Sequence, residues 1–252
     1  MGAQREGFVV KIRAAATGAP IGVGFVVGDK EMVTCAHVVN VALGRDKACA
    51  ERPPGDARVQ VEFVLLGDAE GGPLRHCRIS SWDPPPGAGR PGRDVAGLAL
   101  VGGDTLPVSA GAARLIDART GLLGDAQVKA FGYPGNPPRK ANGAWSTCVL
   151  RGAVGGGLIQ LDTASESALR TQPGYSGSPV IVTDRWGDAV VGMLAVASRD
   201  GAAPDAARAA ISSAPHRSGA SDSASSSCTT AGRRTSTPPS PSTPRLARRR
   251  TR

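Results

Sequence analysis

The sequence predicts an all-β protein. Short segments with two-residue hydrophobic alternation follow one another closely, credible helices are scarce, and glycine- and proline-rich turns such as "TGAP" and "DPPPGAGRPGRD" separate the segments. In the first half, strands are expected at residues 7–14, 21–27, 31–35, 58–66, 74–82 and 94–101. Six strands within about a hundred residues favour a closed barrel or a sandwich.

The second half repeats this organisation with one clear strand fewer. After a glycine-rich connector at residues 102–124, strands are expected at 126–132, 144–153, 157–163, 178–184 and 188–197. The only further apolar run is the weak one at Ala209–Ile211. Whether the second half contains a sixth strand therefore stays open.

The C-terminal segment differs in composition from the rest of the chain. From about residue 204 it consists mainly of Ser, Thr, Pro, Ala and Arg, which cannot bury enough apolar surface to offset the entropy lost on ordering. We expect an N-terminal barrel at 1–105, a C-terminal barrel at 106–203 and a disordered tail at 204–252.

The positive charge of the chain is concentrated in that tail. The net charge is +9, but nine arginines and only two aspartates lie after residue 203. The body therefore carries a charge of about +2, which does not indicate nucleic-acid binding. The terminal "RLARRRTR" has no interleaved aromatic residue, so no specific nucleic-acid partner is expected.

The cysteines and the N-terminus indicate a cytoplasmic protein. The five cysteines are odd in number and lack the paired spacing of a zinc site, which is typical of free thiols in a reducing compartment. They are Cys35, Cys49, Cys77, Cys148 and Cys228. The N-terminus lacks an uninterrupted apolar core, and no apolar run is long enough to span a bilayer. We expect no membrane partner, no metal and no cofactor.

Only one of the three histidines is well placed to act as a general base. His37 follows a strand, at a junction where a side chain can be both fixed and reachable, whereas His76 alternates within a strand and His216 lies in the tail. Asp94 ends a loop and opens a buried-looking strand, so its carboxylate is a candidate to orient His37. Alone, Asp94 is equally typical of a simple turn.

The segment "PGYSGSP" offers a candidate nucleophile, Ser176. Gly174 permits a conformation that turns its N–H inward, and Gly177 removes crowding behind the serine, so the amides of Gly174 and Ser176 would form an oxyanion hole. An isolated serine between glycines is more often an ordinary turn.

Chain order discriminates between the ways to assemble a triad. The α/β-hydrolase order needs a histidine after the serine, where only His216 is found, and "GYSGS" lacks the last glycine of G-x-S-x-G. The subtilisin order needs an acid well before the histidine, and Asp29 is too close to His37. The order His37, Asp94, Ser176 remains.

Three segments resemble the signature blocks of trypsin-like serine peptidases of the intracellular bacterial type. They are "GVGFVVGDKEMVTCAHVV", "DVAGLAL" and "GYSGSPV"; "AFGYPG" and "VVGMLAVAS" resemble further blocks. The resemblance covers residues 7 to about 200 and implies two six-stranded antiparallel barrels of the chymotrypsin-like type. It also implies His37 as general base, Asp94 as its orienting carboxylate, Ser176 as nucleophile, and the Gly174 and Ser176 amides as the oxyanion hole.

The resemblance also points to a substrate pocket. It implies that Arg170 lies at the pocket base and that Ala195, Val196 and Ala197 form its wall. An inward Arg170 would favour acidic side chains, and an outward one would leave a small apolar pocket. Tyr175 stands where secreted trypsins have an aspartate that pairs with a newly cut N-terminus, so activation by pro-segment cleavage is not expected.

We therefore expect a serine endopeptidase that acts on peptide or protein substrates through an acyl-enzyme. The alternative is a catalytically inactive trypsin-like domain that works as a binding or regulatory module. A sixth strand in the second barrel distinguishes the two, because without it the substrate pocket is incomplete.

Overall fold

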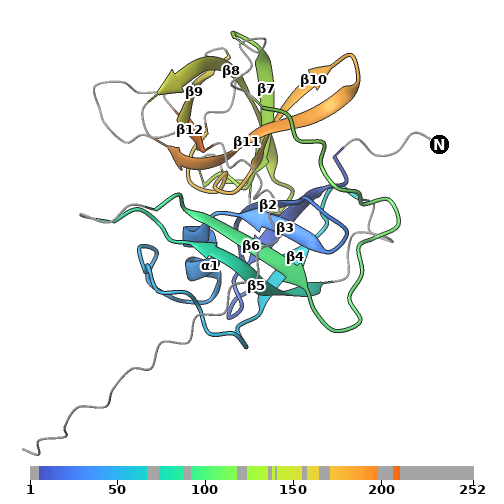
Figure 1. Ribbon diagram of the computed structural model, residues 1–252, viewed down its shortest axis with the longest axis vertical. Helices are drawn as coiled ribbons and strands as arrows, with labels where there is room; N and C mark the ends of the chain where they lie inside the picture. The colour runs from blue at the N-terminus through green and yellow to red at the C-terminus, as the bar shows by residue number, and fades with distance from the viewer. Residues whose placement is uncertain are drawn as a thin grey trace, which may run out of the picture. The chain divides into compact units, whose positions relative to one another are not determined.

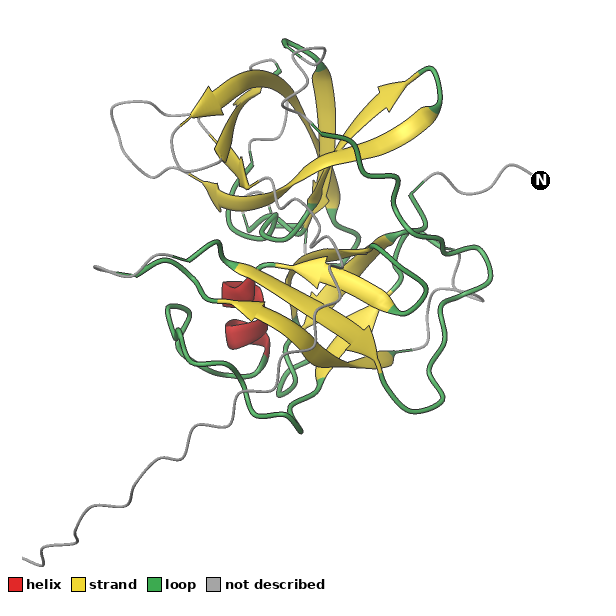
Figure 2. Cartoon of the chain, in the orientation of Figure 1, coloured by secondary structure: helices red, strands yellow, loops and turns green. Residues whose placement is uncertain are grey.

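A computed structural model describes residues 6–66, 74–87, 92–117, 124–135, 138–139, 141–154, 158–164, 171–197 and 207–210; at 196–197 and 207–210 it describes the backbone alone. All of them belong to one compact unit, Met1–Ala214. Strands make up nearly all of the regular structure, with a single short helix in the described part of the chain (Figure 2). No helix found there has the length and apolar character needed to cross a membrane.

The first six strands close into a barrel (Figure 1). They are β1 (Val9–Arg13), β2 (Pro20–Val26), β3 (Glu31–Thr34), β4 (Val59–Glu62), β5 (Arg75–Asp83) and β6 (Val95–Leu100), in the order β1-β2-β3-β6-β5-β4. All pairings are antiparallel. Helix α1 (Ala36–Ala42) directly follows β3. The six strands expected from the sequence are confirmed.

The second barrel contains the later strands. These are β7 (Gln127–Gly132), β8 (Ala144–Val154), β9 (Leu158–Thr163), β10 (Pro179–Asp184), β11 (Gly187–Ala197) and β12 (Ala207–Ala210), in the closed order β10-β11-β12-β9-β8-β7. The expected double barrel is therefore confirmed.

Strand β12 corrects the prediction that the tail begins at residue 204. It pairs antiparallel with β11, from Met193 opposite Ala210 to Ala197 opposite Ala207, and with β9 on its other side. The weak pattern of "ARAA" did not predict this strand, because the pairing uses backbone groups that β9 and β11 would otherwise leave unsatisfied. The second barrel has its sixth strand, and residues 211–252 lie outside the described part.

The barrels share buried apolar contacts. One core cluster fills the first barrel and continues into residues of the second, among them Tyr133, Ile181 and Met193. A second cluster, which includes Leu161, Tyr175 and Val180, fills the interior of the second barrel. The surface between the barrels is thus packed like a protein core, which fixes the side chains that border it.

We predict that the chain is substantially less stable without β12. A chain ending at residue 203 leaves the facing backbone groups of β9 and β11 unpaired, so its free energy of unfolding should fall by about 2 kcal/mol or more. A matched chain ending at Ala214 should stay within about 0.5 kcal/mol of the full chain. Urea denaturation measures all three, and equal values for the two shortened chains would contradict the assignment.

Candidate active site

Helix α1 places His37 at the junction of the two barrels. The chain leaves β3 at Thr34, passes through the extended Cys35 and starts the helix at Ala36, so His37 lies in the first turn. Cys35 makes no side-chain cap. The N–H groups of this first turn therefore need acceptors from elsewhere in the chain.

Asp94 supplies those acceptors. Its backbone oxygen accepts from the Ala36 N–H at 3.3 Å, and its carboxylate Oδ1 accepts from the His37 N–H at 2.8 Å. Asp94 itself adopts a left-handed φ of +59°, which aspartate tolerates better than most residues. A backbone conformation of this kind persists only where surrounding contacts enforce it.

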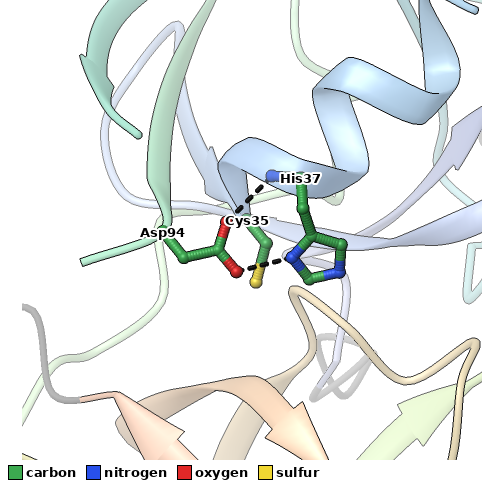
Figure 3. Close-up of side chains that lie close together, drawn as sticks. All are labelled: Cys35, His37 and Asp94. Atoms are coloured by element: carbon green, nitrogen blue, oxygen red, sulfur yellow. Dashed lines mark hydrogen bonds and ion pairs between the residues drawn. The ribbon is translucent and has the colours of Figure 1, made fainter. Parts of the chain in front are cut away.

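The same carboxylate holds the imidazole ring. Asp94 Oδ2 lies 2.5 Å from His37 Nδ1, and both side chains are buried. Because an ionised carboxylate only accepts hydrogen bonds, Nδ1 carries the proton and Nε2 is left as the basic nitrogen. Figure 3 shows Nδ1 turned toward Asp94 and Nε2 turned away from it.

Cys35 lies beside this pair, as Figure 3 also shows. Its thiol is fully buried and donates to the Leu194 carbonyl at 3.3 Å. Burial, and then the nearby Asp94 carboxylate, raise the pKa of the Cys35 thiol well above its usual range. The thiol is therefore neutral and a poor nucleophile. Sequence reasoning did not connect Cys35 with this site, although it lies only two residues before His37.

The loop that carries Ser176 is formed by close backbone approaches. Gly174 has a φ of +107°, and a Cβ there would lie 2.1 Å from the Tyr133 carbonyl oxygen. Gly177 has a φ of +82°, and a Cβ there would lie 1.9 Å from the Val23 carbonyl oxygen. Both positions require glycine, as expected for Gly174 from the sequence.

Two backbone N–H groups of this loop make no hydrogen bond within the described residues. The N–H groups of Tyr175, Gly177 and Ser178 donate to backbone carbonyls. Those of Gly174 and Ser176 donate to no partner in the described residues. These are the two amides assigned to the oxyanion hole from the sequence.

The first barrel braces the loop. Val23 donates its N–H to the Ser176 carbonyl oxygen at 2.9 Å, and the Thr34 hydroxyl donates to the Val23 carbonyl oxygen at 2.6 Å. Gly22 lies so close that a Cβ would be 2.8 Å from the Ser176 carbonyl oxygen. Sequence reasoning missed these contacts, and Gly22, the first glycine of "IGVGF", was the only signal for them.

Tyr175 anchors the loop from the other side. Its ring is buried in the core of the second barrel and lies against Gly132, where a Cβ would be 2.5 Å from a ring carbon. Burial raises the pKa of the Tyr175 hydroxyl to about 12, so the group is neutral at physiological pH. An apolar contact holds the residue that precedes Ser176.

One pocket brings the predicted catalytic residues together. Its volume is about 680 Å³, and its lining includes His37, Asp94, Gly174, Ser176 and Ala195. The hydrogen bonds among the described residues include none between the Ser176 hydroxyl and His37.

The predicted substrate wall is described only in part. The Ala195 side chain is buried at the pocket, whereas Val196 and Ala197 are described as backbone of β11 alone. Arg170 lies outside the described residues. Its role stays a prediction.

We predict that Gly174→Ala deforms the loop. The added Cβ meets the Tyr133 carbonyl at a φ that alanine rarely adopts, so the free energy of unfolding should fall by about 1–3 kcal/mol. Gly111→Ala is the matched control, because a Cβ there meets nothing within 4 Å. Urea denaturation compares the two variants, and equal losses would contradict the close approach at Gly174.

Comparisons with known proteins agree with this architecture. The protease Rv3671c from M. tuberculosis, in its active form, aligns with a TM-score of 0.52 and 23% identity over 82% of this chain and 77% of its own. An inactive form of Rv3671c from strain H37Rv, a serine-to-alanine mutant, aligns with a TM-score of 0.51 and 23% identity over 82% of each chain. These likenesses show a shared fold. No curated protein sequence matches the chain.

A family comparison goes further than the fold. The model of the trypsin-like peptidase domain matches residues 22–193, from strand β2 to strand β11. This segment is more than half of the chain and contains His37, Asp94 and Ser176. The chain therefore belongs to the family of trypsin-like peptidase domains.

Proposed function

We propose that this peptidase domain is a serine endopeptidase with His37, Asp94 and Ser176 as its triad. The observation that carries the proposal is the bond from His37 Nδ1 to Asp94, beside a pocket that Ser176 also lines. Peptide or protein chains are the proposed substrates.

His37 is the proposed general base. Because Asp94 fixes the ring through Nδ1, Nε2 is free to take the Ser176 proton as the hydroxyl attacks the substrate carbonyl. The Asp94 carboxylate then stabilises the imidazolium without taking a proton itself. His37 later gives the proton to the leaving amine, and water repeats the cycle to release the acyl group.

The amides of Gly174 and Ser176 are the proposed oxyanion hole. Their lack of a hydrogen-bond partner among the described residues supports this role, because donors fixed in advance stabilise developing charge most effectively. The left-handed turn at Gly174 orients the first of them, and the contact from Val23 to the Ser176 carbonyl supports the second.

The substrate preference has two candidates. An inward Arg170 would select acidic side chains, whereas an outward Arg170 would leave the small apolar surface to which Ala195 contributes. A peptide library with varied residues before the cut site distinguishes them.

The inactive binding module is less well supported. This alternative was considered because the sequence shows no clear sixth strand in the second barrel, and β12 supplies that strand.

A reducing, cytoplasmic location is proposed from the cysteines, because Cys35, Cys49, Cys77 and Cys148 are free thiols.

Replacement of the proposed nucleophile is the direct test. Ser176→Ala should lower turnover of a casein substrate by roughly 10⁴- to 10⁶-fold and abolish labelling by a fluorophosphonate probe. Ser81→Ala, which changes an exposed serine of β5, should label like the original chain. Labelling that persists in the Ser176→Ala variant would refute the assignment.

Asp94→Asn should separate the catalytic role of Asp94 from its structural one. Asparagine tolerates the left-handed φ and still accepts from the His37 N–H, so the fold should survive. An amide cannot stabilise the imidazolium, so kcat should fall by about 10⁴-fold.

Asp125→Asn is the control for this variant. Asp125 also has a positive φ, +57°, but its exposed side chain pairs with Arg151 on the surface. Activity should be unchanged there. A fall in kcat of similar size in both variants would contradict the role of Asp94. An unchanged kcat in both variants would contradict it as well.

A further inference from the structure

Three potential metal ligands of different chemistry meet next to the pocket. Cys35 Sγ, a ring nitrogen of His37 and a carboxylate oxygen of Asp94 all lie within 4.8 Å of one another, and all three residues are buried (Figure 3). Within the described ranges no other group of three or more such residues comes together in this way. Packing of a thiol beside the His37–Asp94 pair does not by itself require all three ligand atoms to lie so close together.

We propose that Cys35, His37 and Asp94 form a binding site for a thiophilic divalent cation such as Zn²⁺, and that the bound ion switches off the peptidase. Thiolate, imidazole and carboxylate are the ligands that Zn²⁺ uses in proteins. Mg²⁺ and Ca²⁺ prefer oxygen ligands and do not fit this set.

The charges of the site suit a divalent ion. Without an ion, the Cys35 thiol carries a proton, which it donates to the Leu194 carbonyl oxygen. A coordinating ion removes that proton outright. The thiolate and the Asp94 carboxylate then neutralise the two positive charges, so the buried cluster carries no net charge.

The geometry requires side-chain movements of roughly 1 Å, because the three ligand atoms already lie within 4.8 Å of one another. Bonds of about 2.0 Å to nitrogen and oxygen and about 2.3 Å to sulfur place tetrahedral ligands roughly 3.3–3.6 Å apart. His37 Nδ1 and Asp94 Oδ2, now 2.5 Å apart, would separate by about 1 Å to reach that spacing. The pocket is lined by His37 and Asp94 but not by the buried Cys35, so the proposed ion enters on the side of the first two ligands.

Coordination changes the tautomer of His37. Nδ1 gives its lone pair to the ion, the ring carries its proton on Nε2 after exchange with solvent, and the thiol proton leaves to solvent. One proton is released overall. A ring with Nε2–H cannot accept the Ser176 proton, so the base is lost while the pocket stays open. This inhibitory consequence rests on the proposed function; the binding itself does not.

Cobalt provides a readout that does not depend on catalysis. Co²⁺ added to the reduced full chain should produce a near-ultraviolet thiolate-to-cobalt charge-transfer band. The band should persist in the Ser176→Ala and Cys148→Ala variants and disappear in the Cys35→Ala and Cys35→Ser variants. The two Cys35 replacements guard against misfolding, which thermal unfolding of each variant checks.

Zinc tests the inhibitory consequence. Zn²⁺ should slow fluorophosphonate labelling of the original chain, with recovery on chelation. The Cys35→Ala variant should need a Zn²⁺ concentration about tenfold higher or more for the same fractional slowing, measured against its own zinc-free labelling rate.

No cobalt band in the original chain, or a band retained without Cys35, would overturn the site. A normal band with labelling unaffected by zinc would overturn the inhibition, and a normal band in a chain that never labels would instead count against the proposed function.

Discussion

The Asp94 carboxylate makes the two hydrogen bonds on which the site depends. One oxygen accepts from the backbone of the first turn of α1, and the other accepts from the His37 ring. The same group therefore fixes where the helix starts and which nitrogen of the imidazole is basic. Buried hydrogen bonds to a charged group are strong and directional, so one side chain sets both the position and the tautomer of the His37 ring.

The loop that carries Ser176 depends on both barrels in a similar way. Its second-barrel side is held by the buried Tyr175 ring, and its first-barrel side by the Val23 amide. Gly174 and Gly177 allow backbones from both sides to approach more closely than any Cβ permits. The resulting loop is fixed by contacts remote in sequence, which is how a small serine side chain is kept at one place in the pocket.

Local patterns predicted most of this structure. The alternation of apolar and polar residues predicted the strands of both barrels except β12. The order of the candidate residues along the chain pointed to His37 and Asp94, which the structure joins by hydrogen bonds. Strand β12 escaped because "ARAA" carries no side-chain signal and forms through backbone pairing. The left-handed Asp94 and the contact of Cys35 with the pair also escaped, because both arise from the meeting of distant segments.

The late position of β12 in the chain affects how the protein is made. During synthesis the first barrel, with His37 and Asp94, emerges complete while the segment that carries Ser176 is still to come, and the second barrel closes only when residues 207–210 pair with β9 and β11. Neither barrel alone contains both His37 and Ser176. If His37, Asp94 and Ser176 form the triad as proposed, a nascent chain assembles its active site only after the second barrel has left the ribosome.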